Sequence, residues 1–369
     1  MTTHAKPEKA PFPFSQATCM GIMAIFLLCL LLKNAEIAVD HMRAGLRLCA
    51  STVIPSLFPF MVVSEWLVSS GIGNRRGRSA RRFLGISGEA LPAILLGALC
   101  GFPVGAKTAI ALYDSGRLSG RETEWLLTFC NTPSPGFLIS AVGISMFGCR
   151  SFGIFLYVAA LGSSLAVGVL FRILRPIPRQ EAIPSSFRPV TASASFSRGI
   201  ASATSSMLSV CACVVFFTSV IGCLSHATDA LCLPSAVEAF LFGIFEISSG
   251  VSAAADEPSA IRLALCGFAV GWSGISVHCQ ILSVGSGRGI SFKPYFLSKV
   301  LQGLFCAAAA YVYGKRIAPD ILASSEISGQ PKSILFPLVV CLFFCICMLR
   351  YGKEKRKNSK ISVTRFPLP

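Results

Sequence analysis

The chain has 369 residues, of which 53% are hydrophobic and only 14% are charged, and its mean hydropathy is +0.67. This composition excludes an ordinary soluble enzyme or binding domain and indicates several membrane spans. The formal net charge of +16 does not indicate nucleic acid, because the basic residues lie in short loops and tails beside apolar runs. The positive-inside rule explains that placement, so we expect membrane lipids as partners and no nucleic acid.

The 16 cysteines are scattered through apolar segments and lack the paired spacing and nearby histidines of a zinc site. We expect them to be small packing residues, with no metal site and no disulfide framework. The sequence contains no nucleotide-binding fingerprint and no nucleophile with a positioned base. We therefore predict no enzyme activity and no cofactor, apart from a coupling Na⁺ or H⁺.

The N-terminal part, residues 1–49, is expected to contain a polar tail, a first span over 17–32 and an amphipathic helix over 35–49. The helical period of the amphipathic segment fits a helix on the membrane surface, and a packed connector is the alternative. A second span over 50–68 follows. The next loop, 71–88, contains five arginines, which predicts that it lies in the cytoplasm.

Residues 91–147 are apolar but interrupted twice. The first interruption contains Gly101, Pro103 and Gly105, and the second contains Pro133 and Pro135 beside polar residues. Proline has no N–H to donate and glycine weakens a helix, so both places should break the helical hydrogen bonding. Broken backbone within a bilayer is tolerated only where it is buried in protein or lines a wet cavity. Such interruptions predict a polar site inside the membrane, as in transporters with discontinuous helices.

The first interrupted segment, 91–113, has basic residues near both ends and is predicted to be re-entrant. A linker over 172–198 is expected in the cytoplasm. A second interrupted segment, 233–255, has Glu246 and Gly250 near its centre. The remaining spans are expected over residues 121–147, 151–171, 199–225, 261–287, 295–314 and 333–349, with both termini in the cytoplasm.

Two parts of the chain, 50–171 and 199–314, show the same order of span, broken hairpin, interrupted span and plain span. The charge pattern starts the first part outside and the second part inside, and residues 315–369 add a final span and a basic tail. The predicted fold is therefore an all-α polytopic membrane protein with two inverted repeats and broken, re-entrant helical hairpins. Landmarks that recur between the halves are Gly97 with Gly105 against Gly243 with Gly250, and Phe129 against Phe268.

Four motifs lie in order between about residue 45 and residue 314: GFPVGAK, LLTFCNTPSPGFLISAVG, FGIFEISSG and GWSGISVHCQ. In these motifs the chain resembles the YlbJ or SpoVV type of sporulation integral membrane proteins. That type belongs to the nucleoside-recognition or Gate-domain family, which is distantly similar to concentrative nucleoside transporters. The chain departs from the usual pattern in its short arginine-rich loop and at Phe102, where related chains often have tyrosine.

The resemblance implies a multi-pass protein of a bacterial cell membrane, located in the mother-cell-derived outer forespore membrane. It implies transport of dipicolinic acid toward the forespore. A substrate with two carboxylates would suit a site that offers a cation, backbone N–H groups and hydroxyls. The candidate substrate-binding residues are Lys107, Asn131, Thr132, Ser134, Glu246, Ser248, Ser249, Ser273 and His278.

Each candidate also has a structural interpretation. Lys107 either binds a substrate carboxylate or extends to the membrane interface. Glu246 either binds a coupling cation or proton or pairs with Lys107, and His278 either relays a proton or bonds to a neighbouring helix. The neutral candidates either bind substrate or hold helices together. A nucleoside carrier and a non-transporting scaffold for spore assembly are the alternative functions, and a homo-oligomer is left open.

Overall fold

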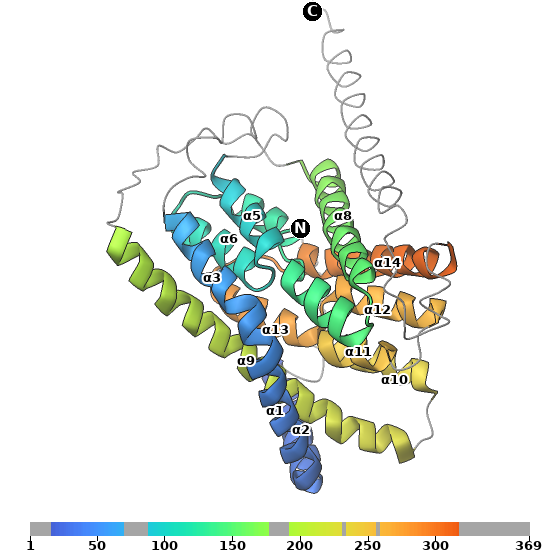
Figure 1. Ribbon diagram of the computed structural model, residues 1–369. Coiled ribbons are helices and arrows are strands. Elements are labelled where there is room, and N and C mark those ends of the chain that lie inside the picture. The colour runs from blue at the N-terminus through green and yellow to red at the C-terminus, as the bar shows by residue number, and fades with distance from the viewer. Residues whose placement is uncertain (1–15, 70–87, 177–191, 231–233, 256–258, 317–369) are drawn as a thin grey trace, which may run out of the picture.

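The computed structural model describes residues 16–69, 88–176, 192–230, 234–255 and 259–316 (Figure 1). The secondary structure of these residues is helical and contains no strand, which confirms the all-α prediction. The segments that are long and apolar enough to cross a membrane are Arg150–Leu174, Gly199–His226, Ala260–Gly285 and Lys293–Arg316. Together with shorter apolar helices they confirm a polytopic membrane protein. Two predictions fall outside the described residues. They are the cytoplasmic location of the arginine-rich loop after the second span and the span over 333–349.

The N-terminal helices are α1 (Gln16–Lys33), α2 (Ala35–Leu48) and α3 (Ile54–Ser69). The short π-helix η1 (Cys49–Val53) joins α2 to α3 without a break in helical structure. Small residues of α2 face helix α9 (Ala192–Ala230), and a Cβ placed on Gly45 would lie 3.2 Å from the Cα of Val215. The α2 helix therefore packs against the bundle through small residues, while Val39, Met42 and Leu46 remain exposed.

The first broken hairpin consists of η2 (Gly88–Ala90), α5 (Leu91–Leu99) and α6 (Val104–Asp114). Its turn contains Gly101, whose φ of +76° is unfavourable for other residues, and Pro103, which caps α6. A Cβ placed on Gly105 would lie 2.7 Å from the Cα of Gly97. The two glycines therefore let α5 and α6 approach closely.

The next helix, α7 (Gly120–Leu127), begins with a capping box in which the amide N of Glu122 donates to Ser119 Oγ at 3.2 Å. Helical structure stops after α7 and resumes in the π-helix η3 (Gly136–Met146), so Pro133 lies within the interruption and Pro135 at its end. The long helix α8 (Arg150–Leu174) follows. The interruptions lie at Gly101 with Pro103 and at residues 131–134, whereas Gly105, which the sequence analysis places in the first interruption, lies inside α6.

In the second half, α9 is followed by a hairpin of α10 (Ser235–Phe245) and α11 (Ile247–Ala255), with extended backbone at Glu246. A Cβ placed on Gly250 would lie 2.2 Å from the Cα of Gly243, which repeats the close approach seen in the first hairpin. The last helices are α12 (Ala260–Trp272), α13 (Gly274–Gly285) and α14 (Lys293–Arg316). The break between α12 and α13 is at Ser273, whose φ is +75°.

Loops that the charge pattern places in the cytoplasm lie together. The Nε of Arg288, after α13, donates to both carboxylate oxygens of Asp114, at the end of α6, at 2.8 and 2.9 Å. This hydrogen bond raises the pKa of the Arg288 guanidinium above its ordinary value. At the other end of the bundle the rings of Phe152 and Tyr313 lie 5.6 Å apart, so the first residues of α8 meet the last residues of α14. The contacts agree with the predicted sidedness of these helices.

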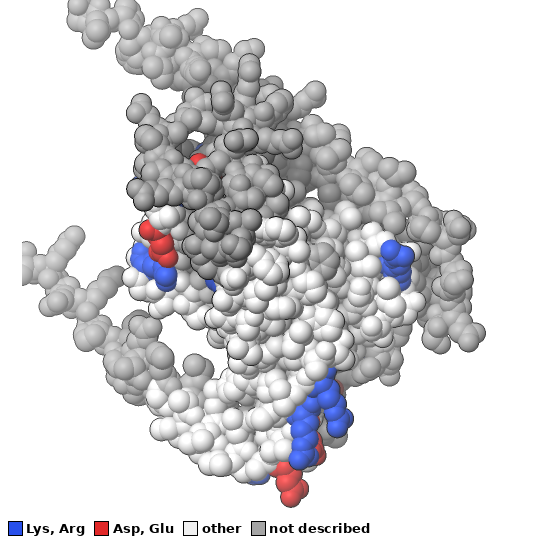
Figure 2. Space-filling model, turned by 60° about the vertical axis from the view of Figure 1, so that its left-hand side comes forward, with Lys and Arg blue, Asp and Glu red and all other residues white. Residues whose placement is uncertain are grey.

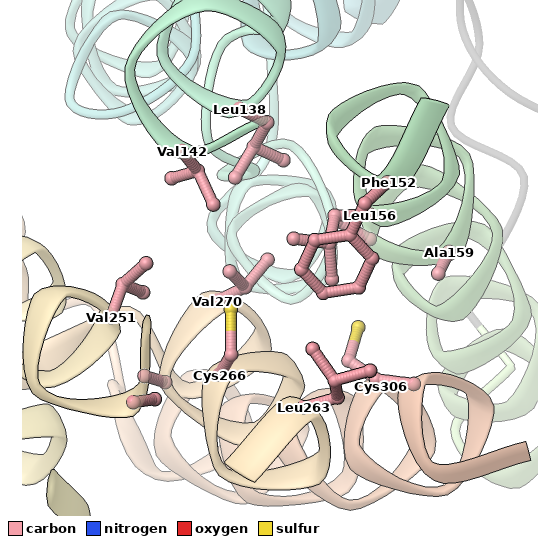
Figure 3. Close-up of a cluster of buried hydrophobic side chains, with 14 of the residues drawn as sticks. Leu138, Val142, Phe152, Leu156, Ala159, Val251, Leu263, Cys266, Val270 and Cys306 are labelled. Carbon is pink, nitrogen blue, oxygen red and sulfur yellow. The ribbon is translucent and has the colours of Figure 1, made fainter. Parts of the chain in front are cut away.

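Several clusters of buried apolar side chains join the two halves, and the one with the most members lies between η3, α8, α11, α12 and α14. Figure 3 shows side chains of η3 and α8 directed toward side chains of α11, α12 and α14. The labelled members are Leu138, Val142, Phe152, Leu156, Ala159, Val251, Leu263, Cys266, Val270 and Cys306. On the face shown in Figure 2, charged side chains lie near the margins and the area between them is uncharged. Such a surface is suited to contact with lipid.

Candidate functional site

The two interruptions of the first half form one unit. The Phe102 N–H donates to the Thr132 carbonyl at 3.1 Å, and Thr132 Oγ1 donates to the Gly97 carbonyl at 3.1 Å. A Cβ placed on Gly101 would lie 2.6 Å from the amide N of Ser134. The turn of the α5–α6 hairpin is therefore held directly against residues 131–134, and its backbone groups find partners there.

The two interruptions of the second half also lie together. The indole N–H of Trp272, at the end of α12, donates to the Ile244 carbonyl in α10 at 3.1 Å. A Cβ placed on Gly274 would lie 3.1 Å from the Cα of Glu246. The turn of the α10–α11 hairpin is thus packed against the break between α12 and α13.

Lys299, on α14, connects these two units. Its side chain is only 1% exposed, and its Nζ donates to the Asn131 carbonyl, to Gln302 Oε1 at 3.1 Å and to Ser273 Oγ at 3.3 Å. Within the described residues no Asp or Glu carboxylate forms an ion pair with it. A buried ammonium that has only neutral acceptors carries a positive charge that nothing nearby neutralises.

Lys299 is not among the predicted site residues, because the sequence of residues 295–314 indicates a plain span. A signal was available, since a lysine lies well inside an apolar segment and Gln302 follows it by one helical turn. In the structure the Nε2 of Gln302 donates to the Thr128 carbonyl at 2.6 Å. This contact fixes α14 against the interrupted helix of the first half.

Two side chains in this region have buried polar atoms without a hydrogen-bond partner among the described residues. They are Oδ1 of Asn131 and Nε2 of His278. The other ring nitrogen of His278, Nδ1, lies 2.7 Å from the hydroxyl of Tyr295, which is one helical turn before Lys299. Since buried polar groups are normally paired, these atoms are available to a ligand.

The Glu246 carboxylate is 2% exposed and accepts hydrogen bonds from the Ser249 N–H at 2.8 Å and from Ser249 Oγ at 3.0 Å. It therefore caps the first turn of α11, where a negative charge is favourable. Ser248 is buried in the same turn. Glu246 and Ser249 hold the second hairpin turn in shape.

Lys107 lies at a different place. Its Nζ donates to Ser202 Oγ and Ser206 Oγ of α9, both at 2.7 Å, and to the Ser202 carbonyl at 3.3 Å. No ion pair joins Lys107 to Glu246, although the structure describes both side chains. Of the predicted site residues, Asn131, Ser273 and His278 gather near Lys299, while Thr132 and Ser134 hold the first hairpin turn.

Comparison with known proteins supports the resemblance inferred from the motifs. No protein-family model matches the chain, and no solved structure matches it. The sporulation integral membrane protein YlbJ of Bacillus subtilis (strain 168) is 28% identical to it over 327 residues, which cover 77% of the chain and 79% of the relative. The predicted resemblance to the YlbJ type of sporulation integral membrane proteins is thus confirmed.

Proposed function

We propose that this protein is a secondary transporter that carries a small organic anion across a membrane during sporulation. The observation that carries the proposal is the environment of Lys299, a buried cation whose acceptors among the described residues are neutral. It contacts one helix interruption of each half, at Asn131 and at Ser273. A substrate carboxylate would supply the missing negative charge. An empty site would keep the ammonium hydrogen-bonded, and a bound anion would neutralise it.

Dipicolinate is the substrate that the family resemblance implies, moved from the mother cell toward the forespore across the mother-cell-derived outer forespore membrane. One of its carboxylates would bind the Lys299 ammonium. The Tyr295 hydroxyl can donate to Nδ1 of His278, which leaves Nε2–H of His278 to donate to the second carboxylate. The site thus offers two donors suited to a dicarboxylate.

We further infer that the two halves are inverted repeats that move relative to one another during transport. Two matching contacts support this inference, besides the shared order of elements and the paired hairpin glycines. A Cβ placed on Gly168 of α8 would lie 2.7 Å from the Phe129 ring, and one placed on Gly303 of α14 would lie 3.1 Å from the Phe268 ring. In each half, a phenylalanine before the interruption packs on a glycine of the last helix.

The test is uptake of labelled dipicolinate and labelled uridine into proteoliposomes that contain the full chain, with empty liposomes as the control. We expect saturable uptake of dipicolinate and none of uridine. An imposed Na⁺ gradient and an imposed pH gradient, applied separately, identify the coupling ion. Uptake of uridine alone would support a nucleoside carrier, and uptake of neither compound by correctly inserted protein would support a scaffold. Either result would overturn the proposal.

A further inference from the structure

A cavity of about 360 Å³ opens where α7, the end of α8 and the start of α14 meet. The side chains that matter for its chemistry are Arg121, Glu124, Trp125, Thr128, Phe171 and Arg175. It lies on the face that the charge pattern predicts to be cytoplasmic, where the Ser291 N–H donates to Glu124 Oε1 at 2.9 Å. Its volume is within the range of roughly 300–1,000 Å³ that small-molecule sites occupy.

The cavity is positively charged. Within the described residues, the side chains of Arg121 and Arg175 make no hydrogen bond and no ion pair, and both residues are exposed. The carboxylate of Glu124 accepts the Ser291 N–H but keeps its negative charge, so it offsets only one of the two lining arginines. A third arginine, Arg172, lies over the Trp125 ring at 5.1 Å from its centroid and adds positive charge beside the cavity. Two guanidinium groups are therefore left to bind an anion.

Aromatic side chains form one wall of the cavity. The Trp125 indole is held in place, because its N–H donates to the Gly168 carbonyl at 2.8 Å and its ring lies 4.7 Å from the Phe129 ring. Phe171, from the last turns of α8, contributes a second ring. Arg172 covers part of the Trp125 ring and both rings are largely buried, so they offer a small, rigid apolar edge beside the two guanidinium groups. Such an edge is suited to a small aromatic ligand that carries carboxylates.

The cavity is also close to Lys299. Thr128 lines it, and the Thr128 carbonyl accepts the Gln302 amide at 2.6 Å. The Oε1 of the same Gln302 accepts from Lys299 Nζ at 3.1 Å. One side chain, that of Gln302, therefore bridges the cavity wall and the buried ammonium.

We propose that this cavity is an outer binding site for small aromatic carboxylates, in which the substrate binds at the cytoplasmic face before it reaches Lys299. The order in which substrate occupies the cavity and then Lys299 depends on the proposed transport function. Binding in the cavity can nevertheless be measured without transport. An anionic lipid headgroup could bind the same two arginines. The test must therefore distinguish a bound lipid from a bound aromatic carboxylate.

The experiment measures equilibrium binding of labelled pyridine-2,6-dicarboxylate to the purified full chain in detergent. A Lys299→Met background removes the cation of the inner site. On that background we expect Arg121→Gln with Arg175→Gln to weaken binding roughly tenfold or more, since charged hydrogen bonds are lost. Arg121→Lys with Arg175→Lys should recover part of the affinity. Arg150→Gln, at the opposite end of α8, is the matched control and should bind normally.

Competitors test the chemistry of the site. Benzoate should displace the labelled ligand more effectively than inorganic phosphate, and uncharged pyridine should not displace it. Equal displacement by benzoate and phosphate would overturn the aromatic part of the proposal. Displacement by phosphatidylglycerol, without saturable binding of the dicarboxylate, would assign the arginines to lipid and overturn the proposal.

The same variants separate this inference from the proposed function. Unchanged affinity in the Arg121→Gln, Arg175→Gln chain, with normal uptake into proteoliposomes, rejects the outer site alone. Arginine-dependent binding without any uptake of dipicolinate rejects the transport function and keeps the site. A monodisperse elution profile for each variant shows that a loss of affinity does not result from unfolding.

Discussion

The turns of the two hairpins are built on the same close approach of glycines but are held by different chemistry. Neutral groups hold the α5–α6 turn, namely the backbone of Phe102 and the hydroxyl and carbonyl of Thr132. The α10–α11 turn contains the carboxylate of Glu246, which caps α11 through Ser249. Of the groups that hold the two turns, the Glu246 carboxylate is the charged one, and its charge could respond to an ion. The comparison separates the glycine packing that both hairpins share from the hydrogen bonds that differ between their turns.

The largest expected effect concerns the cation between the two turns. Lys299→Met keeps an unbranched side chain, one heavy atom shorter, but removes its charge. We therefore expect dipicolinate uptake to fall about 100-fold or more, since loss of a buried charge partner costs about 3–5 kcal/mol. The measurement is the initial rate of uptake into proteoliposomes. Lys293→Met, at the exposed start of the same helix, is the control. A rate within a few-fold of the unmodified chain would show that Lys299 does not bind the anion.

The next prediction tests whether the two hairpins are packed alike. A Cβ at Gly105 would lie 1.8 Å from the Cys130 carbonyl oxygen, and one at Gly250 would lie 2.2 Å from the Cα of Gly243. Gly105→Ala and Gly250→Ala should each destabilise the protein by about 1–3 kcal/mol or more, because backbone must move. Melting temperatures in detergent measure the effect, with Gly21→Ala, where no atom lies within 4 Å, as the control. A wild-type melting temperature for either variant would contradict the close packing.

A smaller effect is expected for the carboxylate of the second turn. Glu246→Ala removes the cap of α11 and should cost about 1 kcal/mol, while Glu246→Gln, which keeps an acceptor, should cost less. Hydrogen exchange at the Ser249 amide reports the loss directly, because that N–H donates to Glu246. Equal protection of this amide in the Ala and Gln variants would exclude a capping role.

The smallest effect is expected in the neutral turn. Thr132→Val removes one hydroxyl but keeps the backbone bond to Phe102, and should cost about 0.5 kcal/mol, the lower end of the range for a neutral hydrogen bond. Neither the pH dependence nor the ion dependence of uptake should change, because the Thr132 hydroxyl and the Gly97 carbonyl that it contacts carry no charge. A shift in either dependence would remove the distinction between the two turns.

The interruptions could be predicted from the sequence because their causes are local. Gly101, Pro103 and Pro133 disturb helical hydrogen bonding wherever they occur, and the Ser119 to Glu122 capping box marks a helix start. The structure places helix breaks or ends at these positions. The glycine pair of each hairpin was likewise recognisable as a recurring spacing, although the contact between its members required the structure.

The centre of the site was only partly predictable. The sequence indicates Asn131 and Ser273 as site residues because they lie in interruptions. Lys299 lies in an unbroken helix, so no local pattern marks it as a site residue. The partners of Lys107, Ser202 and Ser206, are about a hundred residues away in the sequence, so local patterns give no indication of them. Contacts of that kind depend on which helices pack together, and a single sequence does not specify this packing.

The three hydrogen bonds of Lys299 have a mechanical consequence. They tie α14 to an acceptor in each half of the chain, Asn131 in one and Ser273 in the other. Any rocking of one half past the other must stretch at least one of these bonds while the ammonium remains shielded from water. If the protein transports an anion as proposed, the bound anion lowers the energy of that strained intermediate. The anion-bound protein should then switch between its inward-facing and outward-facing states more readily than the empty protein.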